Sequence, residues 1–373
     1  MSAVGTAPWW VAAGTVAGLL ACDAADPPTT PSTGNFSSPE GLVAVDDLVA
    51  VANVDFRGTS FGDGSVTVIE AASRSVVNRI PTTLPNPQFL AVTPELLVAV
   101  SSGLTAWDAE AGVHTATGSG GIDVFHRATL RTATAPDVHI PLPADPGDPR
   151  RGGPGSIAVL PDGRTAYVAS GLAAVIAKVD LEDGSVARGM DDPIIVRSHE
   201  RNETLTLAWH PSGVVLAACF VSGELYRLDP ATDTVGAPVT LVAGGDLEGV
   251  IDLHVSPGTS PDVLWVSTIA NALGAWELDA GAPDPRAAAT GVAANRVRVA
   301  GDHAYVVNSG ENNIQRSPLS DLGAVDRPFA VLPVGSNPWD MAVAGELGFV
   351  SLFRANRVAV VDLKTGALLG EIQ

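Results

Sequence analysis

The segment GSIAVLPDGRTAYVASGLAAVIAKVDLEDGSVARGM, residues Gly155–Met190, is the clearest copy of the unit from which this chain is built. Three apolar segments, SIAVL, TAYVAS and VIAKVDL, have the length of β-strands, and a fourth, SVARGM, follows them. The turns Pro-Asp-Gly and Glu-Asp-Gly separate the first and the last pair of these segments, and such residues favour tight turns. The stretch therefore predicts four antiparallel strands, which we call A to D.

The same order of strands and turns recurs along the rest of the chain. First strands begin near residues 42, 89, 156, 205, 251, 296 and 340, so the period is close to fifty residues with one long outlier. A four-stranded sheet has two apolar faces that it cannot bury alone, whereas sheets packed face to face around an axis bury both. We therefore predict an all-β chain that forms a seven-bladed β-propeller of four-stranded antiparallel blades. The predicted blades are residues 42–87, 88–153, 154–203, 204–249, 250–294, 295–337 and 338–373.

The alternative is a parallel β-solenoid, although its repeats are usually shorter and lack hairpin turns. Closure of a propeller ring also needs an explanation, because no terminal strand is left to complete a blade from the opposite end. We expect the ring to close by packing of the last blade on the first, unless residues Phe36–Pro39 add an edge strand.

Composition excludes several classes of protein. The chain has 373 residues with 39 Gly and 28 Pro, and 46% of its residues are hydrophobic while 17% are charged. So much apolar content argues against disorder, and so many Gly and Pro argue against long helices or a coiled coil. The formal net charge of −20 repels phosphate backbones, so we expect no nucleic-acid partner. We expect a monomer.

The N-terminal residues indicate export. No charged side chain occurs from Met1 to Cys22, and residues 9–21 form an apolar run of the length of a signal-peptide core. The sequence Leu19-Leu20-Ala21-Cys22 resembles a bacterial lipobox, which implies that residues 1–21 are a signal peptide and that Cys22 is the lipidation site. Residues 22–39 are rich in Pro, Thr and Ser, which indicates a tether that joins this anchor to the folded domain. We therefore expect a protein secreted across the inner membrane, as a periplasmic or outer-membrane or surface lipoprotein.

Two other interpretations of the N-terminus remain open, namely a chance cysteine in an Ala-rich leader and an uncleaved membrane anchor. If Cys22 is acylated, Cys219 has no partner for a disulfide within the chain. Cys219 lies in an apolar strand, so we expect an inert buried thiol.

The repeat also resembles the YVTN-type propeller repeat. The residues that carry the resemblance are Pro154–Val159, Pro338–Val343, Ala304–Asn308 and Asn356–Asp362. The resemblance extends from Leu42 to the C-terminus and implies the propeller fold. It does not imply one activity, because such propellers include binding platforms, surface proteins and enzymes.

The longest connections are expected on one face of the propeller. The B-to-C loops and the D-to-A crossovers share a face, and they include Asn53–Gly64, Ser101–Gly121, Pro141–Gly155 and Arg197–Glu203 in blades one to four. Long loops on a rigid scaffold commonly carry binding sites, although drift at tolerant positions also lengthens loops. We call this the long-loop face and predict a binding surface there. Its candidate binding residues are Asn53, Asp55, Arg57, Asp63, Trp107, His114, Arg150, Arg151, His199, Glu200, Arg201, Asn308, Asn312, Trp339, Asp340 and Arg354.

Motifs of known chemistry are scarce. The seven His form neither H-x-H nor H-E-x-x-H, and no P-loop, G-x-S-x-G or C-x-x-C-H is present. The sequence therefore predicts no metal site, no cofactor and no set of catalytic residues. The turn His210–Gly213 (HPSG) is similar to one in propeller lactonases, so a hydrolase or lactonase-like enzyme with its site in the central channel is the alternative. The favoured function is a binding module for a protein, a glycan or a small ligand.

Overall fold

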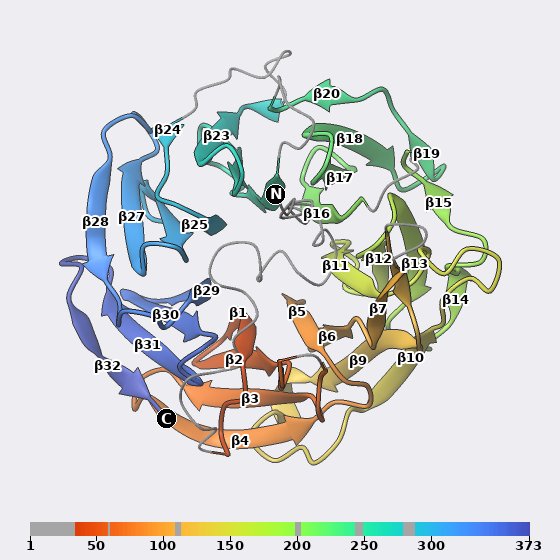
Figure 1. The fold of residues 1–373 in the computed structure, drawn as a ribbon, viewed down its shortest axis with the longest axis horizontal. Coiled ribbons are helices and arrows are strands. Elements are labelled where there is room, and N and C mark those ends of the chain that lie inside the picture. Colours follow the sequence, from red (N-terminus) through yellow and green to blue (C-terminus); the bar gives the residue numbers. More distant parts are fainter. Residues whose placement is uncertain (1–33, 59, 109–112, 198–202, 243–248, 279–287) are drawn as a thin grey trace, which may run out of the picture.

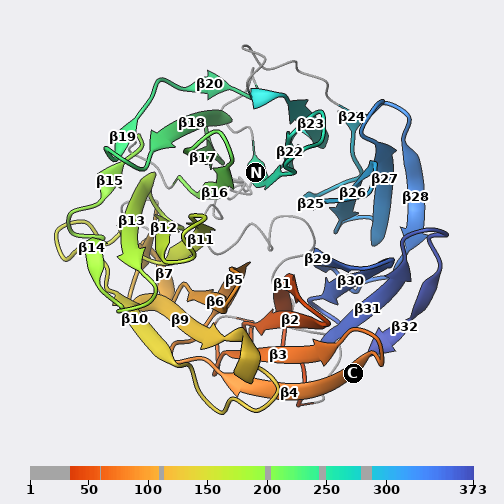
Figure 2. The ribbon, with the colours of Figure 1, turned by 180° about the vertical axis from the view of Figure 1, so that it is seen from behind.

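The computed structural model describes residues 34–58, 60–108, 113–197, 203–242, 249–278 and 288–373. Seven antiparallel sheets surround a central axis, as Figure 1 shows from one side and Figure 2 from the other. The fold class predicted from the repeat is confirmed. The innermost strands are β1 (Pro39–Val45), β5 (Pro87–Val92), β11 (Pro154–Val159), β16 (Leu205–His210), β21 (Val250–Val255), β25 (Ala294–Ala300) and β29 (Pro338–Ala344).

The two middle strands of each blade run antiparallel to their neighbours. The second strands are β2 (Leu48–Asn53), β6 (Leu96–Ser101), β12 (Thr165–Ser170), β17 (Val214–Cys219), β22 (Val263–Ser267), β26 (His303–Asn308) and β30 (Leu347–Leu352). The third strands are β3 (Ser65–Glu70), β9 (Gly120–His126), β13 (Val175–Asp180), β18 (Glu224–Asp229), β23 (Ala272–Trp276), β27 (Asn313–Pro318) and β31 (Arg357–Asp362).

The outermost strands are less regular. In blade three, β14 (Val186–Arg188) and β15 (Ile194–Ile195) both pair with β13, and in blade four β19 (Thr234–Val235) and β20 (Val239–Thr240) both pair with β18. The outermost strand of these two blades is therefore broken into two pieces. The outermost strands of the other five blades are β4 (Ser75–Pro81), β10 (Val138–Leu142), β24 (Ala288–Ala289), β28 (Asp326–Val331) and β32 (Leu368–Ile372).

Blade two is longer than the rest for two reasons. Its B-to-C loop contains a hairpin of β7 (Thr105–Asp108) and β8 (Val113–Ala116), which accounts for part of the extra length on the long-loop face. Its C-to-D connection is also long, with the 3-10 turn Arg127–Thr129 between β9 and β10. The expectation that extra length gathers on one face is therefore wrong for blade two, which has insertions on both faces.

The core lies between the blades. A separate cluster of buried apolar side chains fills each of the seven contacts between neighbouring blades. Between blades two and three, for example, Val124 and Ile140 pack with Val168 and Val179. Each sheet is thus apolar on both faces, as the sequence predicts, because it packs against a neighbour on both sides.

The ring closes without a strand shared between the two termini, since blade one is built from β1–β4 and blade seven from β29–β32. Residues Phe36–Ser38 form no extra strand, but Phe36 is fully buried between these two blades. Polar bonds join the same seam, where Ser38 N donates to Asn356 Oδ1 (2.6 Å) and Ser351 Oγ donates to the Glu40 carbonyl (2.7 Å). The folded domain therefore begins before the tether boundary expected at residue 39.

The signal peptide, Cys22 and most of the tether fall outside the described residues. Within the part that is described, no helix has the length and apolar character needed to cross a bilayer. Cys219 is fully buried on β17, and burial raises the pKa of its thiol, as expected for an unreactive cysteine.

Candidate functional site

One buried polar side chain from every blade lies at the long-loop end of the inner strands. Six of these strands have a register shift near this end, whereas β16 pairs regularly. Such bulges bend a strand and redirect its side chains, and they are common beside functional sites. We call this set the channel-mouth ring, and it consists of Glu40, Gln88, Ser156, Thr206, Asp252, Arg296 and Asp340, all less than 9% exposed.

Charges concentrate on one side of the ring, where blades five, six, seven and one meet. The Arg298 guanidinium on β25 bridges two carboxylates, with Nη1 at 2.7 Å from Asp252 Oδ2 and Nη2 at 2.6 Å from Asp340 Oδ1. The same carboxylates accept bonds from the next inner strand, since Val297 N donates to Asp252 (2.9 Å) and Leu42 N donates to Asp340 (3.2 Å). These contacts hold four blades together and also fix the positions of the charges.

Burial changes the ionisation of three groups in this region. It raises the pKa of Glu40 to about 8, against the attraction of Arg296 and with the added repulsion of Asp340. Burial and then the charge of Arg298 lower the pKa of His254 to about 4, so this imidazole is neutral at pH 7. Burial alone would raise the pKa of Asp252, but Arg298 and Arg296 hold it below its ordinary value. The site therefore combines a carboxylic acid, a neutral imidazole and ionised carboxylates.

We expect Glu40 to make the stability of the fold depend on pH. Because its pKa is about 8 when folded and near 4.5 otherwise, the folded protein holds this proton more tightly than the unfolded chain does. The stabilisation is fully present below the lower value and is lost as the pH rises through the upper one. Urea unfolding should therefore show a midpoint that falls between about pH 5 and about pH 8 and levels off above that, as far as Glu40 is concerned. The Glu40→Gln variant cannot ionise there, so an equal fall in that variant would contradict the assignment.

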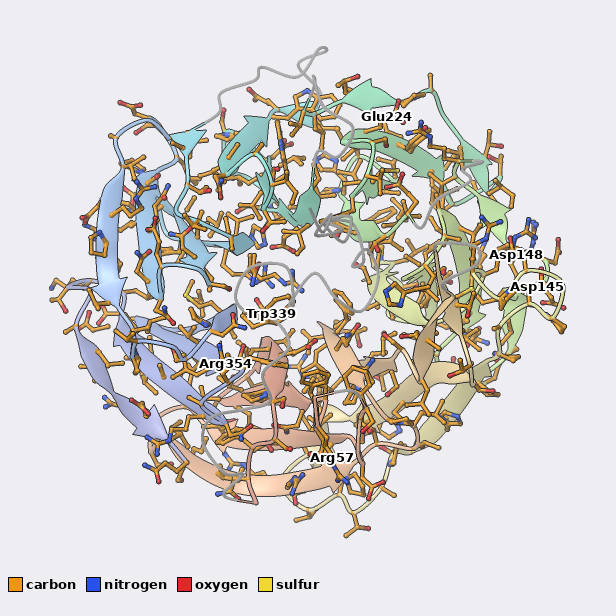
Figure 3. The ribbon with its side chains drawn as sticks, in the orientation of Figure 1. Arg57, Asp145, Asp148, Glu224, Trp339 and Arg354 are labelled. Atoms are coloured by element: carbon orange, nitrogen blue, oxygen red, sulfur yellow. The ribbon has the colours of Figure 1, made fainter. Side chains whose placement is uncertain are left out.

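Aromatic rings flank the charges. The Arg296 guanidinium lies 5.6 Å from the ring centroids of both Phe89 and Trp339. Trp339 in turn packs with Phe56 and Phe353, which come from the long loop of blade one and from blade seven. Figure 3 shows Trp339 beside the centre of the propeller. Phe89, His254 and Arg298 are only partly buried, so an aromatic ring, an imidazole and a guanidinium remain accessible at the mouth.

Only some of the predicted binding residues come together here. Trp339 and Asp340 belong to the channel mouth, whereas Asp55 and Arg57 pair with each other at 2.5 Å in the blade-one loop near exposed Asp63. Arg150 and Arg151 pair with Asp148 and Asp145, and Figure 3 places these two carboxylates at the periphery. The partly buried Arg354 donates its backbone N–H to the Ser336 carbonyl (3.0 Å) in the crossover to blade seven.

Several predicted binding residues serve the fold itself. Asn53 and Asn308 are fully buried, and their side chains bond within blade one and within blade six. Asn312 has a positive φ of 52° immediately before β27, where it shapes a tight turn. His114 is buried on β8, opposite Trp107 in the register of the hairpin. His199, Glu200 and Arg201 lie outside the described residues, as does the placement of the Trp107 side chain.

Sequence reasoning missed Glu40, Asp252, Arg296 and Arg298. The signal that could have found them is the start of each inner strand, where a polar residue stands just before the apolar segment in PEGLV, PQFLA, PGSIA, VIDLH, ANRVR and PWDMA. Aligning the repeats at this position would have placed one polar side chain from each of these six blades at the same level. The described residues include no group of three or more His, Cys, Asp or Glu arranged to hold a metal ion.

Comparison with known proteins bears on the fold. The chain matches no protein-family model, and no curated protein is similar to it in sequence. A selenomethionine form of virginiamycin B lyase from Staphylococcus aureus aligns with a TM-score of 0.62 at 11% identity, covering 86% of this chain and 93% of the lyase. A streptogramin B lyase gives 0.61 at 11% identity over 87% and 93% of the two chains. The computationally designed Ika8 protein gives 0.55 at 11% identity over 93% and 90%. At such identity these likenesses show the propeller fold alone.

Proposed function

We propose that this protein is a secreted, lipid-anchored propeller of the YVTN type that binds a ligand at the long-loop end of its channel. The observation that carries the proposal is the charged and aromatic channel mouth. Arg298 is held by two carboxylates from the two neighbouring blades, so binding a ligand there costs little ordering of the protein. Burying such a network is costly for folding, which favours a functional reason for its presence.

The accessible groups define the kind of ligand. The charge of Arg298 is already balanced by Asp252 and Asp340, so its remaining N–H groups and the neutral imidazole suit a ligand with hydroxyl groups. The ring of Phe89 suits the apolar face of a sugar or another ring. The long loops of blades one to four would form the surrounding rim. We therefore favour a glycan or a small hydroxylated ligand over a second protein as the occupant of the mouth.

The test is a screen of glycans and small hydroxylated ligands by thermal shift, followed by calorimetry on the hits. The Arg298→Lys variant keeps the charge but loses the planar fork that holds both carboxylates and a ligand. Arg316→Lys is the matched control, because Arg316 pairs with Asp326 at 3.0 Å on the outer part of blade six. Ligands of the channel mouth should lose affinity in the first variant and keep it in the second. Hits that are equally affected by both variants would contradict the proposed site.

A second candidate function is a hydrolase or lactonase-like enzyme in the channel. The observation that favours it is Glu40, a carboxylic acid whose pKa is raised to about 8 by burial and by the nearby carboxylate of Asp340. Such a group can donate a proton to a leaving oxygen. The protein should therefore also be tested for turnover of lactones, esters and a streptogramin B antibiotic. Turnover that disappears in Glu40→Gln would favour the enzyme over the binding module.

The predicted lipid anchor at Cys22 can be tested separately from the channel mouth. Replacing Cys22 by serine removes the thiol that would carry the lipid, so the protein should move from the membrane fraction to the soluble exported fraction. The measurement is fractionation with detection of the processed chain. A Cys22→Ser protein that remains in the membrane and is processed as before would contradict the lipoprotein, while leaving the channel-mouth proposal untouched.

A further inference from the structure

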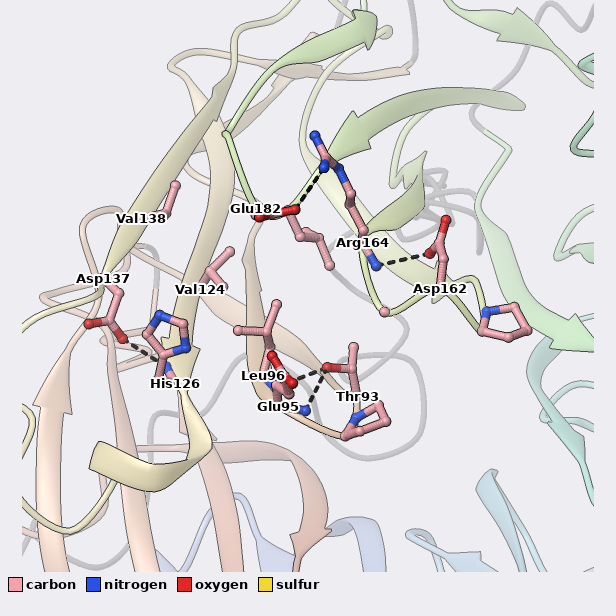
Figure 4. Close-up of a pocket in the computed structure, with 14 residues that line it drawn as sticks. Thr93, Glu95, Leu96, Val124, His126, Asp137, Val138, Asp162, Arg164 and Glu182 are labelled. Carbon is pink, nitrogen blue, oxygen red and sulfur yellow. Dashed lines mark hydrogen bonds and ion pairs between the residues drawn. The ribbon is translucent and has the colours of Figure 1, made fainter.

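A cavity of about 570 Å³ lies between blades two and three on the face opposite to the long loops. It is formed by the A-to-B turns of both blades, by the long C-to-D connection of blade two and by the start of the C-to-D turn of blade three. The volume is in the range of small-molecule sites. Figure 4 shows this cavity with its lining side chains.

The floor of the cavity is apolar. Leu96, Val124, Val138 and Leu181 line it, and all four belong to or pack against the apolar cluster between blades two and three. The insertion in blade two thus leaves part of this interface open to a ligand rather than covered by a short turn. An occupant with a hydrocarbon segment would bury apolar surface here.

The walls of the cavity are acidic. Four carboxylates, from Glu95, Asp137, Asp162 and Glu182, face one guanidinium, from Arg164, so the formal charge of the lining is −3 with His126 neutral. Arg164 is already neutralised, because it forms ion pairs with Asp180, with Glu182 (2.7 Å) and with Asp183 (3.1 Å). Its positive charge is therefore not available to balance the remaining carboxylates.

Glu95 and Asp137 form no ion pair within the part of the chain that is described. Asp137 accepts a bond from the backbone N–H of His126 at 2.7 Å, and Figure 4 shows this bond across from Glu95. The Glu95 side chain is exposed, and the bonds of this residue to described groups come from its backbone. Its N–H donates to Thr93 Oγ1 (3.3 Å) in the same turn, and its carbonyl accepts from Arg127 N (2.9 Å). The nearby Arg127 guanidinium bonds to the Thr93 and Pro94 carbonyls (2.6 and 2.8 Å) and pairs with Asp46. Cationic groups of a ligand would thus find two carboxylates that form no ion pair with a described side chain.

We propose that this cavity is a second binding site and that it takes an organic polycation of the polyamine class. In such a molecule hydrocarbon segments alternate with ammonium groups, which matches an apolar floor enclosed by carboxylates. The charges attract each other through a partly aqueous medium, so binding should weaken as salt increases. This site is independent of the channel mouth, from which it is separated by the length of the blades.

The test is calorimetric titration of the full chain with spermidine. We expect one site per chain, and affinity about fivefold weaker in Glu95→Gln, which is the upper end of the effect of losing one exposed ion pair. Glu346→Gln is the matched control, because Glu346 is an exposed carboxylate in the equivalent A-to-B turn of blade seven, outside the cavity. The affinity of the Glu346→Gln variant for spermidine should stay within about twofold of that of the unchanged protein.

Two probes separate a true site from general attraction to an acidic protein. Magnesium chloride at equal ionic strength supplies charge without hydrocarbon, and triethylene glycol supplies a flexible chain without charge. Neither should compete with spermidine for the site. Competition by magnesium, equal effects of Glu95→Gln and Glu346→Gln, or no saturable binding of spermidine would each overturn the proposal.

Discussion

Replacing Asp340 by alanine should lower the free energy of unfolding by about 3–5 kcal/mol, because it removes one partner of a buried ion pair. Asp340 is 4% exposed and lies on the seam where blade seven meets blades six and one. Its carboxylate contacts Arg298 at 2.6 Å and accepts backbone bonds from Leu42 (3.2 Å) and Met341 (2.7 Å). The variant leaves these donors buried with fewer acceptors, and the cost of such groups dominates the loss.

Burial raises the pKa of Asp340, but the guanidinium groups and backbone N–H donors that face the carboxyl favour its ionised form. The measurement is urea unfolding at pH 7. The matched control is Asp302→Ala, since the Asp302 side chain is 90% exposed and pairs with the adjacent His303. The control should change stability by less than about 1 kcal/mol. A loss as small as this in Asp340→Ala would mean that apolar contacts alone close the ring.

Replacing Phe36 by alanine should also destabilise the fold by about 3–5 kcal/mol, because it leaves a cavity where a fully buried ring stood. Phe36 packs against Leu42 and Val49 of blade one and against Phe349 and Ile372 of blade seven. The ring has no strand shared between its ends, so this cluster is the apolar part of its closure. The Phe36 side chain thus fills the space between the first blade and the last and packs against both.

The measurement is again urea unfolding, with Leu369→Ala as the control. Leu369 lies on β32 of blade seven and is 39% exposed, so its truncation should change the free energy of unfolding by no more than about 1 kcal/mol. If Phe36→Ala behaved like this control, residues before β1 would contribute little to the closed ring. The tether would then end where the sequence indicated, at residue 39.

The repeat could be read from the sequence because its signals are local. Turn residues such as Asn312 and Asn356 adopt positive φ immediately before strands β27 and β31, and Asn tolerates this conformation better than most residues. The apolar strands between the turns pack against neighbours on both faces, so their pattern indicates burial without knowledge of the partner. The number of blades and the type of fold follow from counting these units.

Loop length was a poor guide to the position of the candidate site. The long connections of blades one and two drew attention to Asn53 and Arg150, yet Asn53 is a buried bonding partner of its own blade and Arg150 pairs with Asp148 in a crossover. The second insertion of blade two lies on the other face, where His126 and Asp137 at its two ends line a cavity. Length alone does not say whether a loop folds onto its own blade.

Short-range patterns in the chain thus specify seven sheets, their turns and their apolar faces, because a strand and a tight turn depend on residues close together in sequence. The meeting of Asp252, Arg298 and Asp340 depends instead on how three successive blades are staggered and on a bulge at the start of the inner strands of these three blades, β21, β25 and β29. The protonated Glu40 beside them depends on burial from several blades at once. Both are properties of the closed ring, in which distant residues share one low-dielectric environment, and no single repeat contains them.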